Sequence, residues 1–250
     1  MPIATETANK VAASARSNAL HITGISSMAT RQVLAELTTA FSERSGHTVA
    51  IESVGGVDAA KRVQAGESFD VVILASDAID ELILAGAIVR GSRVDLVRSG
   101  VAVAVRAGDP SPDITSEEAV KRAVLSAKSI SYSTGPSGVA LAKLFERWGI
   151  AEDIKSRMVQ APPGVPVGTL VASGEVALGF QQLSELLHVK GITIVGPLPN
   201  AIQITTIFSA ALPLRRNAEP ARALAVKALL EFMASGDAAP AKRRQGMESC

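Results

Sequence analysis

Short apolar runs alternate with segments of helical periodicity along most of the chain, and this alternation constrains the fold more than any other feature. The run FDVVILA (69–75) is continuously apolar, as in a strand covered on both faces. In the segment 27–44, apolar residues such as Val33, Leu37 and Phe41 recur on one helical face. Short connections between such units predict parallel strands joined by right-handed crossovers. We therefore expect an α/β fold whose sheets are mixed, mainly parallel and flanked by helices.

The alternation forms two series, separated near the Pro- and Asp-rich turn GDPSPD. Each series has roughly 100 residues, enough for one compact lobe. Clefts at the carboxyl ends of parallel strands are common ligand sites, so two lobes predict a ligand site between them. Strands are expected at 20–25, 47–54, 69–75, 99–108, 128–133, 177–182, 192–196 and 204–213, with a further strand to which 154–160 leads, and a closing helix at about 219–235.

Composition and charge exclude several classes of function. The chain has 25 basic and 24 acidic residues and a net charge of +1, so it predicts no nucleic-acid partner. No apolar run reaches the length of a membrane span, so no membrane insertion is expected. The run KRR (242–244) is interpreted as a short solvated charge run. The three histidines lack metal-ligand spacing, and no cofactor motif occurs, so neither a metal nor a cofactor is expected.

The first residues, MPIATETANKVAASARSNAL, contain charges and no apolar h-region, so they do not resemble a signal peptide. Residues 1–18 are expected to be disordered. The predicted location is cytoplasmic as the sequence stands, and periplasmic if a leader has been removed. Cys250 is the only cysteine, so it cannot form an intramolecular disulfide and does not indicate a redox compartment.

Four segments together resemble a known family: ISSMATRQVLAELTTAF, AAKRVQAGESFDVVILASDAIDEL, STGPSGVALAKLFERWGI and LVASGEVALGFQQLSEL. They are similar to the periplasmic-binding-protein type II fold, and within it to the molybdate-binding, oxyanion-type solute receptors of ABC transporters. The similarity extends from about residue 20 to 247. It implies one lobe formed by 19–100 plus 206–250 and a second lobe formed by 101–205.

The corner Ser26-Ser27 lies where an apolar strand leads into a helix. Unpaired N–H groups and the positive end of the helix dipole at such a corner attract anions. For an isolated Ser-Ser pair, a plain helix cap is the simpler interpretation. The resembled receptors carry a ligand serine at this turn, which favours Ser26 or Ser27 as a ligand contact.

Further contacts implied by the resemblance come from both lobes. Gly55 and Gly56 replace a serine-bearing turn of the family; they offer backbone N–H groups, or serve only as turn glycines. Gln182 replaces a tyrosine frequent in the molybdate receptors; its alternative is pairing with neighbouring backbone. Capping is the alternative role for Ser137. The remaining contacts that the resemblance implies in the second lobe are Thr134, the backbone of Gly138, and a backbone N–H donor in the loop PPGVPVG, either Gly164 or Val165.

The resulting prediction is a protein that closes on a small anion, either an oxyanion or a small organic carboxylate. An ABC-transporter permease is the possible partner. The alternative is a cytoplasmic enzyme on the same fold, an isomerase or tautomerase of a small unsaturated carboxylic acid, in which the cleft stabilises an enolate. Such an enzyme needs a proton carrier, and the sequence does not nominate one.

Overall fold

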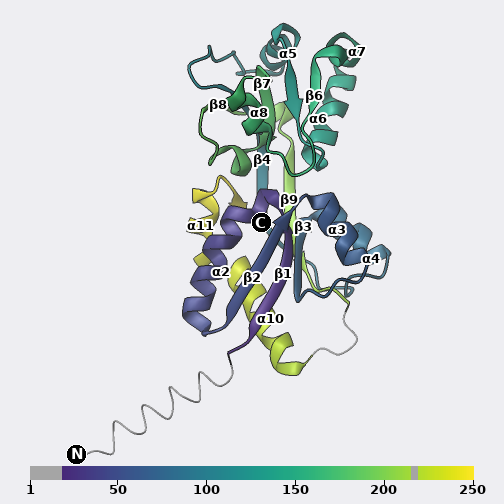
Figure 1. Cartoon of the computed structure of the whole chain (residues 1–250), viewed down its shortest axis with the longest axis vertical. Helices are drawn as coiled ribbons and strands as arrows, with labels where there is room; N and C mark the ends of the chain where they lie inside the picture. The colour runs from purple at the N-terminus through teal and green to yellow at the C-terminus, as the bar shows by residue number, and fades with distance from the viewer. Residues whose placement is uncertain (1–18, 215–218) are drawn as a thin grey trace, which may run out of the picture.

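The computed structural model describes residues 19–214 and 219–250, and it forms two bodies placed end to end (Figure 1). The predicted disordered segment 1–18 lies outside the described residues. Strands β4 and β9 run between the two bodies (Figure 1). Both bodies combine sheets with flanking helices, so the predicted α/β class is confirmed.

The first body contains both ends of the described chain. Its strands follow the order β2-β1-β3-β9-β4; β1 is parallel to β2 and β3, and β9 is antiparallel to β3 and β4. Its elements are β1 (His21–Ser27), η1 (Met28–Thr30), α2 (Arg31–Ser45), β2 (Thr48–Val54), α3 (Gly56–Gln64), β3 (Val71–Ala75), α4 (Ser76–Leu84), the first part of β4 (Val94–Arg106), β9 (Thr205–Ala211), α10 (Pro220–Ala234), η4 (Gly236–Ala238), α11 (Ala239–Arg244) and β10 (Glu248–Ser249).

The second body contains the middle of the chain. Its strands follow the order β4-β7-β5-β6, with β8 also paired to β4. Its elements are the second part of β4, α5 (Glu117–Ser126), β5 (Ile130–Tyr132), α6 (Pro136–Arg147), α7 (Ala151–Ile154), η2 (Lys155–Arg157), β6 (Met158–Gln160), α8 (Val167–Ser173), β7 (Leu178–Gln182), α9 (Leu183–Leu186), β8 (Ile192–Pro197) and η3 (Asn200–Ile202).

Apolar side chains on both faces of the sheets hold each body together. In the first body, α2 and α10 pack residues such as Phe41 and Leu229 on one sheet face, and α3 and α4 pack residues such as Val63 and Ile79 on the other. In the second body, Phe145 of α6 packs edge-on against Phe180 of β7, with ring centroids 6.1 Å apart. Burial of a side chain of this size contributes roughly 1.5–3 kcal/mol.

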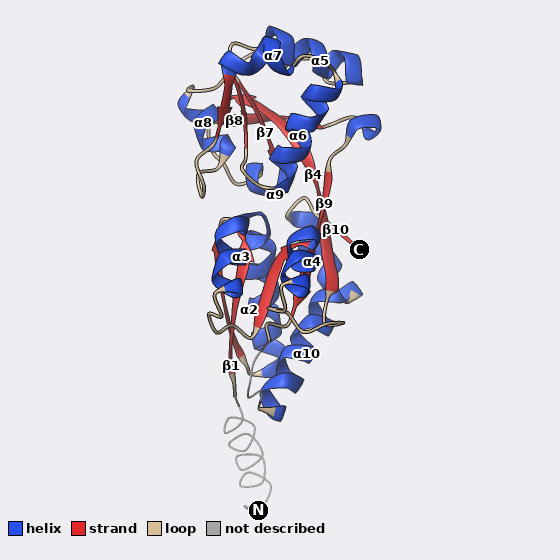
Figure 2. Ribbon diagram, turned by 90° about the vertical axis from the view of Figure 1, so that its right-hand side faces the viewer, coloured by secondary structure: helices blue, strands red, loops and turns tan. Residues whose placement is uncertain are grey.

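Strand β4 changes partners along its length. Up to Gly100 it pairs with β9 in the first body, and from Val101 it pairs with β7 and β8 in the second. Figure 2 shows α3 and α4 at the end of the first body that faces α9 of the second. Chain crossings near 100 and 205 remain our proposed lobe boundaries.

The sequence suggested that the charge run 242–244 is solvated, and for Lys242 this interpretation is wrong. Lys242 is only 1% exposed, and its ammonium donates a hydrogen bond of 2.8 Å to the Leu96 carbonyl. The short elements α7, α9, α11 and β10 were also not predicted. No helix within 19–214 or 219–250 combines the length and apolarity needed to cross a bilayer.

Candidate functional site

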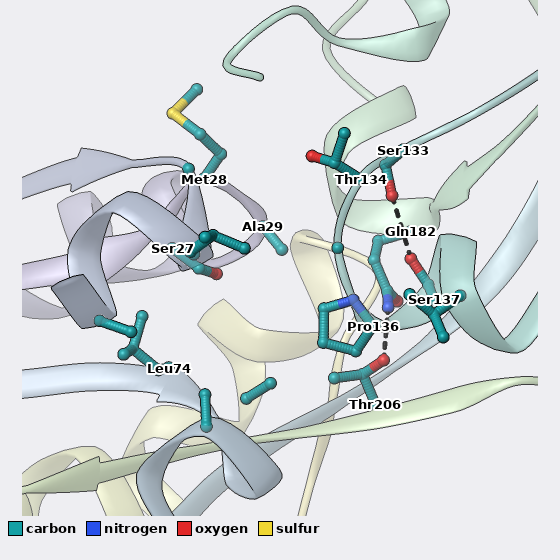
Figure 3. Close-up of a pocket in the computed structure, with 18 of the residues that line it drawn as sticks. Ser27, Met28, Ala29, Leu74, Ser133, Thr134, Pro136, Ser137, Gln182 and Thr206 are labelled. Carbon is teal, nitrogen blue, oxygen red and sulfur yellow. Dashed lines mark hydrogen bonds between the residues drawn. The ribbon is translucent and has the colours of Figure 1, made fainter. Parts of the chain in front are cut away.

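A cavity of about 670 Å³ lies between the two bodies, and segments of both contribute to its wall. The first body provides the ends of β1 and β3 and the starts of α3 and α4. The second provides the loop after β5, the start of α6, the loop 161–166 and the end of β7. Figure 3 shows Ser27 on one side and Thr134, Pro136 and Ser137 on the other. The cavity therefore joins corners that are far apart in sequence.

Ser27 ends β1 at the wall of this cavity. It is 8% exposed, and its hydroxyl has no hydrogen-bond partner within the protein. Although Ser27 is the N-cap residue of η1, its side chain makes no capping bond. A buried hydroxyl without a partner costs free energy unless a ligand or water supplies one. The Ser27 hydroxyl is thus available to a molecule in the cavity.

Ser26 does not line the cavity, because successive strand residues point to opposite faces. It is fully buried, and its hydroxyl lies 2.8 Å from the hydroxyl of Ser53 on β2. Between the two predicted serines, only Ser27 faces the cavity.

Three helices of eight or more residues begin at the cavity: α3, α4 and α6. Gly55 and Gly56 line the cavity at the start of α3, as Gly135 and Pro136 do at the start of α6. None of the three N-cap side chains makes a capping bond, so the first N–H groups are not satisfied in that way. Three positive helix ends therefore converge on one space.

In the second body, Thr134 and Ser137 line the cavity, and the Ser137 hydroxyl lies 3.4 Å from that of Ser133. Gly138 does not line it, and its N–H already donates to the Gly135 carbonyl. A β-carbon at Gly138 would sit 1.8 Å from the Ser133 carbonyl oxygen. The absent side chain thus lets α6 pack against the preceding turn, so we assign Gly138 to packing instead of ligand contact.

In the loop 161–166, the backbone N–H of Val165 does not play the part that was expected of it. Val165 lines the cavity, but its N–H donates to the Pro162 carbonyl at 3.0 Å. That N–H is already engaged and is not the free donor that the family resemblance implied. Val165 contributes an apolar side chain to the wall, together with Val57, Leu74 and Phe208.

Two glutamines close β7 at the cavity. Gln182 donates a 2.7 Å hydrogen bond from its amide nitrogen to the Thr206 hydroxyl, while its own oxygen has no partner within the protein. Because Thr206 accepts this bond, its hydroxyl hydrogen is free for another acceptor. The Gln181 oxygen accepts from the N–H of Gly168 at 3.4 Å.

Glu185 lines the same cavity from α9. Burial raises the pKa of its carboxyl from 4.5 to about 7, and a hydrogen bond from Gln181 opposes part of this rise. At neutral pH the group is therefore divided between the ionised and the protonated form. Such a group is suited to both accepting and donating a proton.

Exposed charges at the cavity balance one another. Lys61 and Lys143 are basic, and Asp77 and Glu81 are acidic. Attraction for an anion therefore has to come from oriented hydroxyls, amides and helix ends more than from net charge. In the part of the chain that the structure describes, no group of three His, Cys, Asp or Glu residues is placed to hold a metal ion.

The chain belongs to the bacterial extracellular solute-binding protein family, whose model matches residues 22–248. Its sequence is 42% identical over 190 residues to aconitate isomerase from Pseudomonas sp, a match that covers 75% of this chain and 70% of the relative. Its fold is similar to the periplasmic molybdate-binding protein of Azotobacter vinelandii, with a TM-score of 0.72, 20% identity and coverage of 90% and 98% of the two chains. The structure of L-phospholactate-bound PEB3 matches with a TM-score of 0.71, 14% identity and coverage of 92% and 100%.

These matches confirm the predicted two-lobed fold and the resemblance to molybdate-binding-like solute-binding proteins. They also confirm the predicted class of function, in which a small solute binds between two lobes.

The structure brings most of the predicted contact residues to one cavity, namely Ser27, Gly55, Gly56, Thr134, Ser137, Val165 and Gln182. Sequence reasoning missed Thr206 and Glu185. Glu185 stands within the quoted segment GFQQLSEL, three residues beyond two glutamines that close a buried strand. Its place within three residues of a buried strand end is the local signal for Glu185, and that signal does not show what buries the carboxyl.

Proposed function

We propose that the cavity binds a small polycarboxylate anion, held by uncharged donors from both lobes. The observation that carries this proposal is the buried, unpartnered hydroxyl of Ser27, which faces Thr134 and Ser137 across the cavity (Figure 3). Hydrogen bonds from such donors to a carboxylate contribute roughly 1.5–3 kcal/mol each.

An organic acid fits this cavity better than a tetrahedral metal oxyanion. The volume of about 670 Å³ is in the range of sites for organic ligands. Val57, Leu74, Val165 and Phe208 give the wall an apolar part that suits a carbon skeleton. Gly55-Gly56 also lack the hydroxyl that the resembled receptors place at this turn.

Catalysis at the same site is the second candidate function, as an isomerase of a small unsaturated polycarboxylate. Two observations favour it: the 42% identity to a relative described as aconitate isomerase, and the carboxyl of Glu185 in the cavity. If the solute is instead released unchanged, we propose an ABC-transporter permease as the partner and a place of action outside the cytoplasm.

A thermal-shift series tests the binding proposal. The purified protein is heated with molybdate, tungstate, sulfate, phosphate, citrate, cis-aconitate or trans-aconitate. A ligand at about 100 times its Kd stabilises the folded state by about 2.7 kcal/mol, which raises Tm in a concentration-dependent way. We expect the tricarboxylates to raise Tm more than the inorganic oxyanions do. A shift with molybdate or tungstate alone would overturn the proposal.

Proton NMR separates the receptor from the enzyme. Each aconitate isomer that binds is incubated with catalytic amounts of protein, and the vinyl signals are followed with time. Appearance of the other isomer supports the isomerase. A spectrum that stays unchanged after prolonged incubation supports the receptor and removes the catalytic candidate.

A further inference from the structure

Among the described residues that line the cavity, Glu185 is a half-buried carboxyl that can carry a proton near neutral pH. The cavity's other ionisable side chains, Lys61, Asp77, Glu81 and Lys143, are exposed. An isomerase of the kind proposed above needs one group that removes a proton from carbon and returns it. The structure therefore offers a candidate that the sequence alone did not provide.

Resting on the proposed isomerase function, we infer that Glu185 is the catalytic residue that shuttles a proton between two carbon atoms of the bound polycarboxylate. Its carboxylate accepts a proton from a methylene carbon next to the double bond. The electron pair of that C–H bond then joins the double bond and a neighbouring carboxylate as an extended enolate. The protonated Glu185 returns the proton to the former vinyl carbon, which shifts the double bond by one position. Atoms, charge and oxidation state are unchanged overall.

The surroundings of Glu185 position its carboxyl for this task. Because the Gly168 N–H is a donor, the Gln181 oxygen has to face it, and this leaves the Gln181 amide nitrogen to donate to Glu185. This hydrogen bond restrains the carboxyl of Glu185, which lines the cavity. Gln181 acts as a positioning residue.

Few charges surround Glu185. Among the elements that contact α9, η1, β7 and α8 carry no ionisable side chain. The nearest cations along the chain are Arg106 at the end of β4, Arg31 after η1, and Arg243 and Arg244 before the turn at Gly246, which lies against Leu183 and Leu187. His188, three residues further along the chain, is hydrogen-bonded to Gln245. Burial without a charged partner keeps the carboxyl basic enough to accept a proton from carbon.

Donors for the enolate lie in the same cavity. Ser27 has an unpartnered hydroxyl, and Thr206 has a hydroxyl hydrogen that Gln182 leaves free. Donors aimed at developing negative charge lower the barrier for proton removal from carbon. Glu185 and these hydroxyls together supply the base and the charge stabilisation that the reaction needs.

The test compares wild type, Glu185→Gln, Glu185→Asp and the control Glu146→Gln, an exposed residue of α6. Isomerisation of trans-aconitate is followed by proton NMR, and the same reaction in D2O reports deuterium entering carbon positions. Binding is measured by thermal shift, and folding by circular dichroism. Loss of one general base typically lowers a rate 10²- to 10⁴-fold.

We expect Glu185→Gln to bind trans-aconitate at least as well as wild type. Its rates of isomerisation and of deuterium exchange should both fall by at least about 100-fold. The rise of kcat/KM through about pH 7 that we expect of the wild type should be absent from this variant. Glu185→Asp should keep a measurable fraction of exchange. A wild type that neither isomerises nor exchanges any acid it binds would overturn the isomerase function and, with it, this role. An active wild type with an equally active, folded Glu185→Gln variant would overturn the assignment of Glu185 alone.

Discussion

Replacing Glu185 with glutamine should change the pH dependence of stability in a defined direction. Burial raises the pKa of this carboxyl from 4.5 to about 7 in the folded protein. Below pH 4.5 the group is protonated in both states. Between 4.5 and 7 the unfolded chain releases the proton while the folded protein keeps it. The free energy of unfolding therefore falls as pH rises through this window and does not change further above it.

The magnitude follows from the two pKa values. One pH unit corresponds to about 1.36 kcal/mol, so ionisation of Glu185 costs the folded state about 3 kcal/mol at pH 8 relative to strongly acidic solution. Glutamine has a similar shape and does not titrate. Between pH 5 and pH 8, Glu185→Gln should gain about 2 to 3 kcal/mol in free energy of unfolding relative to wild type.

Urea unfolding at pH 5 and pH 8 measures this gain, with m-values compared to confirm that the same transition is observed. Glu146→Gln, on the exposed surface of the same lobe, is the matched control and should show no comparable gain. A difference between Glu185→Gln and wild type that is equal at both pH values would refute the burial argument.

Three further outcomes are expected. Ser27→Ala should weaken polycarboxylate binding by about 1.5–3 kcal/mol in isothermal titration and leave stability nearly unchanged, whereas Ser26→Ala should lose about 1 kcal/mol of stability and keep binding; equal binding by both variants would remove Ser27 from the site. A bound anion should raise the pKa of Glu185 further, so binding at pH 8 should take up protons, which titration in buffers of different ionisation enthalpy detects; zero uptake would contradict proximity of the two charges. Gly138→Ala should lower the free energy of unfolding in urea by about 1–3 kcal/mol, because its β-carbon would overlap the Ser133 carbonyl. The control Gly135→Ala should lower it clearly less, because its β-carbon would lie 3.8 Å from its nearest neighbour.

Local patterns predicted the fold wherever one strand or helix follows a single periodicity. The continuous apolar run of β3 was recognised because both of its faces are covered. The first part of β4 was missed: its pairing with β9 shifts register between Asp95 and Val97, which leaves Leu96 and Val97 both buried and breaks the two-residue alternation. Lys242 was misread because sequence neighbours do not show that Leu96 offers it a carbonyl.

The residues of the site also differ in whether a local pattern in the sequence indicates them. Ser27 was predictable because a strand-to-helix corner is a local feature. Thr206 reaches the cavity only because β9 returns beside β3 and β4, a tertiary event without a local motif. Glu185 sits on a helix of four residues, too short to produce a periodic pattern. The pKa of Glu185 depends on what buries it, which the order of residues does not state.

The position of Glu185 bears on whether this cleft serves a receptor or an enzyme. A receptor for an anion gains nothing from a half-buried carboxyl without a charged partner in its cavity, because the ionised form repels the ligand. A neutral amide at this position would keep the hydrogen bonding without the repulsion. In an isomerase the same carboxyl is required, because uncharged donors can stabilise an enolate but cannot remove the proton that creates it. The single substitution Glu185→Gln should therefore convert the proposed enzyme into a binding protein, with affinity at pH 8 equal to or greater than that of the wild type and no turnover.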